Sequence, residues 1–523
     1  MRFLADLNPY VFFISIVVIG LFLFFGVFFT ETTGEVFDSV QEFIVTGFGW
    51  FYILAVAFFF VFVIFLFFSP YSSFKLGPDD SEPDYSYVSW FAMLFSAGMG
   101  IGLVFFGVAE PMYHYLAPPT MDGGSVEAAK EAMKLTFFHW GFHAWSIYII
   151  VGLALAYFSF RHNLPLSIRS AFYPLLGERI NGPIGNIVDI LAIFGTMFGV
   201  ATSLGIGVLQ INAGLNFLFH IDFSTTLQIV LIVIITLIAT GSVALGLDKG
   251  IRRLSNFNMI VAISIIGFVF IAGPTIFILN SMVENTGFYL QNLVETTFWL
   301  NSYEGTEWLG DWTLFYWGWW IAWSPFVGTF IARVSRGRTV REFIAGVLLA
   351  PTGFTFIWLT VFGNTGLYME IFGAGGISAG TTEQMLFLML QNLPIAGIIS
   401  LLSVIIIVSF FVTSSDSGSL VIGMLASNGN PNPPLSQRIF WALSEGAVAA
   451  VLLLAGGLAA LQTASITTGL PFAVVLLFIC VSLIKGMSRE REEMTTTRRY
   501  FTAPKPGQRG EKDINLEEGK KSK

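Results

Sequence analysis

The residues of this sequence best suited to chemistry are tryptophans gathered in the apolar stretch 311–326. Tryptophan commonly anchors a helix at the membrane interface, which could explain Trp312 but not the tryptophans deeper in the stretch. On a helix, Trp319 and Trp323 share a face, while Trp320 points about 100° away from Trp319. Indole faces attract quaternary ammonium, a cation with no N–H to donate. The stretch therefore indicates an aromatic cage, with lipid-facing or helix-packing tryptophans as the alternative.

A second aromatic set can complete this cage. It follows His139 and contains Trp140, Trp145 and Tyr148, of which the last two lie three residues apart and share a helix face. His139 and His143 are four residues apart, a spacing that also suits a metal site. Neither a cysteine nor a carboxylate lies close to them in sequence, so we favour the cage over a metal.

Three glycines at alternate positions, Gly98, Gly100 and Gly102, interrupt another apolar segment. Each weakens a helix by about 1 kcal/mol relative to alanine. We expect an unwound stretch at membrane mid-depth, whose carbonyls can bind a cation and whose amides can meet a substrate carboxylate. Close packing of helices through small residues is the alternative. Glu110 ends this segment, as a gate residue or simply as a carboxylate at a helix end.

A hydroxyl-rich patch occupies residues 410–418 within a later apolar segment and includes Thr413, Ser414, Ser415 and Ser417. Polar groups inside a membrane segment are costly unless they have a role. Hydroxyl oxygens suit a small hard cation such as Na⁺. The alternative is that these hydroxyls bond back to carbonyls of their own helix.

The composition identifies the element that must position these residues as the transmembrane helix. Of 523 residues, 55% are hydrophobic and 11% are charged, against about 25% charged in soluble domains. The net charge of −8 is spread over many loops, which argues against a nucleic-acid partner. The single cysteine, Cys480, excludes an intramolecular disulfide. The chain is therefore expected to be an all-α integral membrane protein without enzymatic activity or an organic cofactor.

Apolar segments of spanning length divide the chain. The twelve expected spans are residues 10–30, 48–69, 88–113, 137–160, 187–218, 225–246, 257–280, 312–333, 341–363, 394–425, 437–460 and 464–485. An odd count separates spans 3–7 from spans 8–12, which predicts two five-helix units of opposite orientation. A glycine-broken helix in one unit, a hydroxyl-rich helix in the other and a cage between them indicate a secondary transporter. Residues 1–86 then carry two peripheral spans, residues 87–485 the ten-span transporter core, and residues 486–523 a flexible charged tail. We also expect a surface helix at 121–134 and an interfacial helix at 284–300.

The loops set the expected orientation. Lysine and arginine recur in the loops after spans 4, 6, 8, 10 and 12, whereas most alternate loops are acidic or neutral. This bias predicts a multi-pass protein with both termini in the cytoplasm. The loop around Lys75 fits poorly, because it is acidic yet falls on the cytoplasmic side by count.

The same motifs resemble the betaine/carnitine/choline transporter (BCCT) family over residues 10–485. The resemblance is carried by residues 311–339, by residues 98–102, by the Glu110-Pro111 pair and by residues 411–414. It implies a plasma-membrane secondary transporter with a five-plus-five inverted repeat, surrounded by lipid and often assembled as a homotrimer.

The resemblance also implies roles for individual residues. The central aromatic box would consist of Trp140, Trp145, Tyr148 and Trp320, and the substrate route would be lined by Trp319 and Trp323. One Na⁺ would lie between Ser96 and Met99 on one side and Phe410, Thr413 and Ser414 on the other. A second Na⁺ would lie near Thr196 and Phe326, although Val200 lacks the hydroxyl that members with two sodium sites carry there, unless Thr202 or Ser203 substitutes for it.

One position bears on the coupling ion. Gly102 is neutral, whereas proton-coupled choline carriers of the family tend to have aspartate there. We therefore expect Na⁺-coupled import of glycine betaine or a related compatible solute, as used in osmoprotection. The alternatives are carriers of choline, ectoine, proline or dimethylsulfoniopropionate, with proton coupling as a further option.

Overall fold

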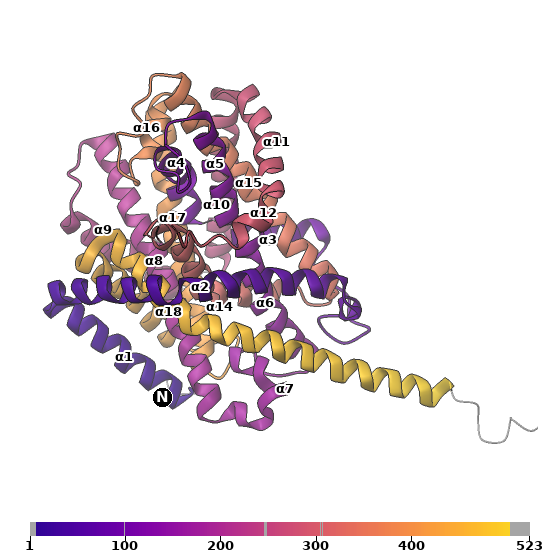
Figure 1. The fold of residues 1–523 in the computed structure, drawn as a ribbon. Helices are drawn as coiled ribbons and strands as arrows, with labels where there is room; N and C mark the ends of the chain where they lie inside the picture. Colours follow the sequence, from indigo (N-terminus) through magenta and orange to yellow (C-terminus); the bar gives the residue numbers. More distant parts are fainter. Residues whose placement is uncertain (1–6, 99, 245–247, 304, 306, 503–523) are drawn as a thin grey trace, which may run out of the picture.

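The computed structural model describes residues 7–98, 100–244, 248–303, 305 and 307–502. Within these residues every regular element is helical, as expected for an all-α membrane protein (Figure 1). The principal helices are α1 (Pro9–Phe28), α2 (Thr30–Phe68), α3 (Tyr87–Gly98), α4 (Ile101–Leu116), α5 (Val126–Trp140), α6 (Phe142–Ala156), α8 (Pro183–Phe219), α9 (Thr225–Ala244), α10 (Asp248–Ala272), α11 (Thr275–Gln291), α12 (Leu293–Thr297), α14 (Phe315–Val334), α15 (Val340–Phe372), α16 (Met385–Gln391), α17 (Ala396–Ala426) and α18 (Leu435–Thr502).

Nine helices of the described residues are long and apolar enough to cross a membrane. Each of the twelve predicted spans nevertheless lies in a helical region. Span 3 is divided between α3 and α4, and span 8 is α14, whose many tryptophans lower its hydropathy. Spans 11 and 12 are both in α18, where Gly456 and Gly457 have non-helical backbone angles. The structure therefore has fewer long apolar helices than predicted spans because of helix breaks, merged helices and the composition of α14, and each predicted span still lies in a helical region.

Two predicted helices have different boundaries in the structure. The expected surface helix at 121–134 is instead α5, which begins at Val126 and runs on to Trp140. Its apolar face, including Ala128, Ala132 and Met133, is buried, so it packs into the bundle. The expected interfacial helix at 284–300 and the predicted end of span 7 at residue 280 are also wrong. Helix α10 ends at Ala272, and α11 runs from Thr275 to Gln291.

Helix pairing fits the predicted inverted repeat. In an inverted repeat of this kind, span 8 corresponds to span 3 and span 9 corresponds to span 4. A contact between spans 3 and 9 should therefore have a counterpart between spans 8 and 4. Both contacts are present, because α15 packs against α3 and α4, and α14 packs against α6. Close approach between helices depends on glycine at Gly328, where an added Cβ would lie 2.5 Å from Val151 Cγ1.

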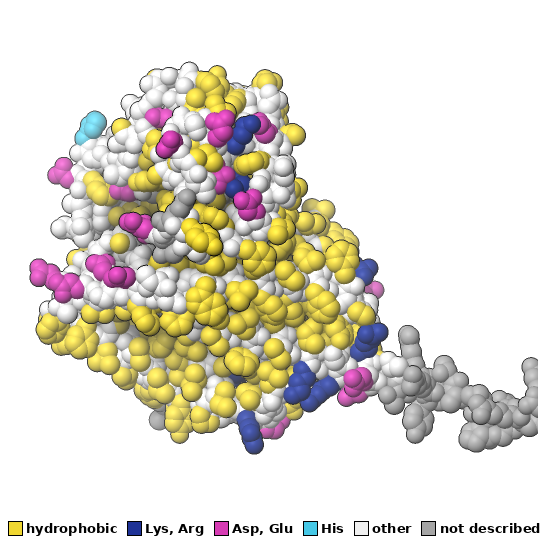
Figure 2. All heavy atoms as spheres, viewed as in Figure 1, with side chains coloured by type: hydrophobic (Ala, Val, Ile, Leu, Met, Phe, Trp, Pro, Cys, Tyr) yellow, Lys and Arg dark blue, Asp and Glu magenta, His cyan; other side chains and the backbone are white. Residues whose placement is uncertain are grey.

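The loop around Lys75 lies beside the basic loop that precedes α15. Lys75 forms an isolated antiparallel bridge with Thr339, and Leu76 N donates to Arg338 O at 2.8 Å. The Asp79 carboxylate pairs with Arg161 at 2.8 Å. The loop's acidic residues therefore share an end of the bundle with arginines. Figure 2 shows several Lys and Arg side chains below a broad hydrophobic band and others above it, where most acidic side chains of this view lie.

The tail prediction is wrong for its first part. Residues 487–502 continue α18 as a helix instead of forming a flexible segment. Met487 is fully buried, and Glu490 accepts from Tyr157 Oη at 2.6 Å and pairs with Arg161. These contacts stabilise the helical extension against the end of span 4. The remaining tail, residues 503–523, lies outside the described residues.

Candidate functional site

The predicted break in span 3 is present. Helix α3 ends at Gly98, α4 begins at Ile101, and Gly100 between them has extended backbone angles of φ −166° and ψ −178°. Glycine at position 102 lets two rings approach the backbone, because an added Cβ would lie 2.7 Å from Trp319 Cη2 and 2.9 Å from Trp140 Cη2. Two sodium candidates, Met99 and the Ser96 side chain, lie outside the described residues.

The six predicted aromatic residues line one small cavity of about 30 Å³, together with Gly100 and Gly102. They come from three helices. Trp140 ends α5, two lie on α6 and three lie on α14. The Trp145 and Tyr148 ring centroids are 5.3 Å apart at 72°. The Tyr148 and Trp320 rings are 6.4 Å apart at 71°. Such edge-to-face pairs expose ring faces, which is the geometry that a cage for a cation requires.

Hydrogen bonds fix three of the indoles. Trp320 Nε1 donates to His139 O at 2.8 Å, and Trp319 Nε1 donates to Gly199 O at 3.3 Å. Trp140 Nε1 donates to Glu110 Oε2 at 2.7 Å. These bonds hold the N–H edges of the three indoles away from the cavity, so the apolar ring faces remain available to a ligand.

Two polar atoms of the cage have no protein partner among the described residues. They are Tyr148 Oη and Trp323 Nε1, both buried. A buried donor without a partner costs free energy, about 1–3 kcal/mol. A bound polar ligand would satisfy both atoms.

Pro325 does not break α14, although a proline in a helix interior commonly kinks or breaks the helix. The helix runs without interruption from Phe315 to Val334. Proline cannot donate to the carbonyl four residues earlier, which belongs to Ile321. Ser324 Oγ donates to that Ile321 O at 2.7 Å instead. A neighbouring side chain thus replaces the missing hydrogen bond.

A second, larger cavity of about 190 Å³ lies between α10, α14 and α17. Trp323 lines both cavities and therefore lies between them. The larger cavity extends to the exposed Arg333. It also contains four of the sodium candidates, namely Phe326, Phe410, Thr413 and Ser414.

Two of the sodium candidates, Thr413 and Thr196, hydrogen-bond to carbonyls of their own helices. Thr413 Oγ1 lies 3.1 Å from Ser409 O and 3.2 Å from Phe410 O, carbonyls of its own helix. Thr196 Oγ1 donates in the same way to Ala192 O at 2.8 Å. A hydroxyl that donates to a carbonyl keeps its lone pairs. Back-bonding therefore leaves both oxygens able to accept a cation.

The neighbouring polar residues divide between different partners. Ser415 Oγ donates to Glu445 Oε2 at 2.9 Å, and Asp416 pairs with Arg438 at 2.9 Å. Of the possible substitutes for Val200, Thr202 contacts Ser465 at 2.9 Å, whereas Ser203 lines the aromatic cavity. The patch at 410–418 thus serves two purposes, since part of it faces the larger cavity and part of it forms buried polar pairs.

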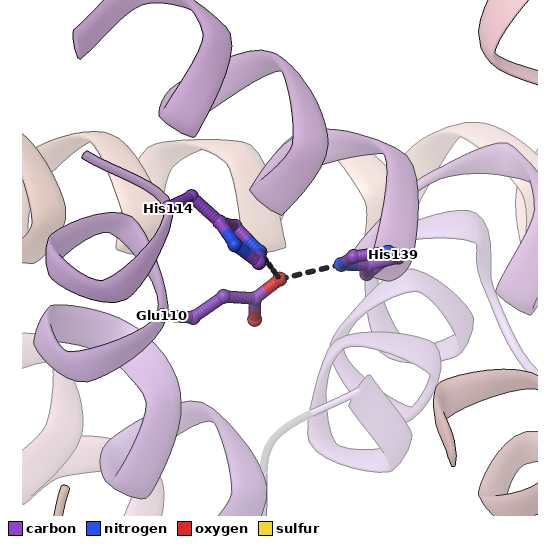
Figure 3. Close-up of side chains that lie close together, drawn as sticks. All are labelled: Glu110, His114 and His139. Carbon is purple, nitrogen blue, oxygen red and sulfur yellow. Dashed lines mark hydrogen bonds and ion pairs between the residues drawn. The ribbon is translucent and has the colours of Figure 1, made fainter. Parts of the chain in front are cut away.

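The structure reveals a polar cluster behind the cage that the sequence did not predict. Glu110 is fully buried within α4, so it is neither exposed nor at the helix end. Its Oε1 lies 2.7 Å from His139 Nδ1 and 3.3 Å from His114 Nε2 (Figure 3). His143, considered above with His139, instead contacts Thr297 at 2.9 Å. The four-residue spacing of Glu110 and His114 was the available signal.

The three residues of this cluster present ligand atoms within 4.8 Å of one another, close enough for a metal ion. Other hydrogen bonds that Glu110 and His139 already make argue against a metal ion here. Oε2 of Glu110 accepts from both Trp140 and Tyr316, and His139 Nε2 lies 2.9 Å from Thr313 Oγ1. Three ligands are also one fewer than a structural zinc site normally has. The arrangement is better described as a hydrogen-bond network centred on Glu110.

Comparison with known proteins adds independent information. The sequence profile described as BCCT, betaine/carnitine/choline family transporter, matches residues 10–492. A glycine betaine transporter of Acinetobacter baylyi is 48% identical over 96% of this chain and 76% of its own length. The glycine betaine transporter OpuD of Bacillus subtilis is 47% identical over 92% of this chain and 95% of its own length. The high-affinity choline transport protein of Escherichia coli is 44% identical over 96% and 75%.

Proposed function

This chain belongs to the betaine/carnitine/choline transporter family, and we propose that it imports glycine betaine together with Na⁺. The family and these relatives are transporters rather than enzymes, and the chain is a multi-pass membrane protein of that kind. Substrate, coupling ion and direction of transport are the parts that we propose.

The aromatic cavity is the observation that carries this proposal. Four of its rings meet edge-to-face and are each less than a tenth exposed, namely Trp140, Trp145, Tyr148 and Trp320. A trimethylammonium head group gains up to about 2 kcal/mol per desolvated ring contact. The substrate carboxylate would meet the amides around Gly100 in the helix break. The cavity is narrow, so binding must move the rings apart, and Trp319 and Trp323 line the route.

Hydroxyl and carbonyl oxygens support sodium as the coupling ion. Thr413 and Ser414 face the larger cavity next to Trp323, and Ser96 and Met99 would complete the site from the broken helix. A second Na⁺ near Thr196 and Phe326 is a weaker proposal, because position 200 is valine.

The larger cavity supports a transport direction. It is lined by Trp323 and by Arg333, which lies in the last turn of α14, and the residues that follow at this end of the helix include Arg336, Arg338 and Arg341. We propose that this end faces the cytoplasm of the cell, that both termini lie there, and that the cavity is the exit route. Assembly as a homotrimer in the lipid of the plasma membrane belongs to the same proposal.

Choline is the second candidate substrate, because the choline transport protein of Escherichia coli is almost as similar to this chain as the betaine relatives. Choline has the same quaternary head but no carboxylate. The neutral Gly102 favours the zwitterion with Na⁺ over the proton-coupled alternative. Ectoine, proline and dimethylsulfoniopropionate are further outcomes of the test.

The test is uptake of labelled glycine betaine by cells that lack their own carriers, with Na⁺ or K⁺ outside. Unlabelled choline and ectoine serve as competitors. Saturable uptake that requires Na⁺ and resists both competitors supports the proposal. Uptake that ignores Na⁺ and follows a proton gradient overturns the coupling ion, and competition by choline alone changes the substrate.

A further inference from the structure

The Glu110 carboxylate lies directly behind one wall of the cage. Its Oε1 lies within hydrogen-bonding distance of nitrogens of both histidines, and its Oε2 accepts from Trp140 Nε1 and Tyr316 Oη. An indole N–H can only donate, and Thr313 Oγ1 can donate to His139 Nε2 so that Nδ1 carries the proton. All four bonds are therefore compatible with a carboxylate that acts only as an acceptor, which is the ionised form.

We propose that Glu110 is a positioning residue that tunes the cage electronically, through the indole of Trp140. The inference rests on the proposed function and adds a residue that does not line the cavity. An indole that donates its N–H to a carboxylate gains electron density over the ring. The ring face becomes more negative and attracts a quaternary ammonium more strongly, because cation–π attraction is electrostatic.

The same cluster also orients a second ring. His139 holds the Glu110 carboxylate through Nδ1, and its backbone carbonyl accepts the N–H of Trp320 at 2.8 Å. The Trp140 and Trp320 ring centroids lie 4.9 Å apart at 68°. A single buried network thus fixes both rings, and burial protects it from competition with water.

The experiment compares two ligands of the same shape. Glycine betaine has a charged trimethylammonium head, and tert-butylacetate has a neutral tert-butyl head with the same carboxylate. Equilibrium binding of both is measured on the purified full-length protein in lipid nanodiscs with Na⁺, by competition against labelled betaine. The quantity of interest is the Kd for tert-butylacetate divided by the Kd for glycine betaine. It is compared between the wild type, Glu110→Gln and Glu110→Asp.

We expect Glu110→Gln to weaken betaine binding by at least about fivefold, which is about half the free energy of one desolvated cation–π contact, and to leave tert-butylacetate binding unchanged or slightly tighter. Glu110→Asp keeps the charge and should restore much of the ratio. Equal loss of both ligands, or no loss of either, overturns the proposal. A wild-type protein that binds no betaine contradicts the proposed function instead.

A double-mutant cycle separates the route through Trp140 from a direct effect of the charge. In a Trp140→Phe background, Glu110→Gln should produce no further fall in the ratio. A further fall of the same size means that the carboxylate acts through space, which overturns the route. If Glu110→Gln does not fold, Tyr316→Phe decides the matter. It removes the competing donor from Oε2, so a ratio below that of the wild type contradicts the proposal.

Discussion

The indoles of Trp319 and Trp320 are stacked, with centroids 4.8 Å apart and an interplanar angle of 14°. Neighbouring residues on a helix point about 100° apart, yet here their rings lie parallel, because their N–H groups bond to different helices. Trp319 bonds to Gly199 on α8 and Trp320 to His139 on α5. The orientation of this cage wall therefore depends on how two other helices, α5 and α8, contact α14.

The first prediction concerns the cage. Trp320→Leu should raise the Kd for glycine betaine about thirtyfold, because the variant loses one desolvated cation–π contact of about 2 kcal/mol. Trp323→Leu should impair uptake as well, since Trp323 lies between the two cavities. The exposed Trp50→Leu variant, on α2, is the matched control. Full affinity for glycine betaine in both cage variants, at normal surface levels, would contradict the assignment of Trp320 and Trp323 to the cage.

A second prediction concerns the close approach at Gly102. Gly102→Ala should abolish most uptake, because the added methyl group would overlap the rings of Trp140 and Trp319. Gly353→Ala on α15 is the control, as its Cβ meets nothing within 4 Å. Uptake and surface expression are measured together. Normal kinetics in Gly102→Ala would show that the rings move aside freely and that their tight packing has no functional role.

A third prediction addresses sodium. Thr413→Ala and Ser414→Ala should each raise the Na⁺ concentration for half-maximal uptake, by about tenfold if one ligand contributes about 1.4 kcal/mol. Thr286→Ala removes a hydroxyl that bonds back to its own helix in the same way, but on α11. It should leave the Na⁺ dependence unchanged. An identical Na⁺ dependence in all three variants would exclude these hydroxyls as ligands.

The fourth prediction tests the orientation. Cys480 is buried and is the only cysteine, so Cys480→Ser gives a background for single cysteines. Ser417→Cys, in the larger cavity, should react with a negatively charged, membrane-impermeant thiol reagent in inside-out vesicles and not in right-side-out vesicles. The buried Ser403→Cys should remain unreactive in both. Labelling of Ser417→Cys only from outside would invert the proposed topology.

Much of the helical architecture could be predicted from the sequence, for a physical reason. A bilayer requires about 20 consecutive apolar residues and leaves backbone groups no partner outside the helix. The expected spans therefore coincide with helices, and three alternate glycines predicted the break between α3 and α4. The aromatic residues could also be proposed from their types and spacing, since few other roles account for indoles deep in a span.

Tertiary structure decided what spacing along one helix cannot show. Glu110 and His139 are 29 residues apart, and only the packing of α4 against α5 brings them together. Likewise, Ser324 offsets the effect of Pro325, and Glu490 keeps the end of α18 helical through Arg161. In each case a side chain supplies a hydrogen bond across a turn or between helices. Hydropathy describes how a segment meets lipid, whereas such bonds depend on which polar groups the fold places within about 3 Å of each other.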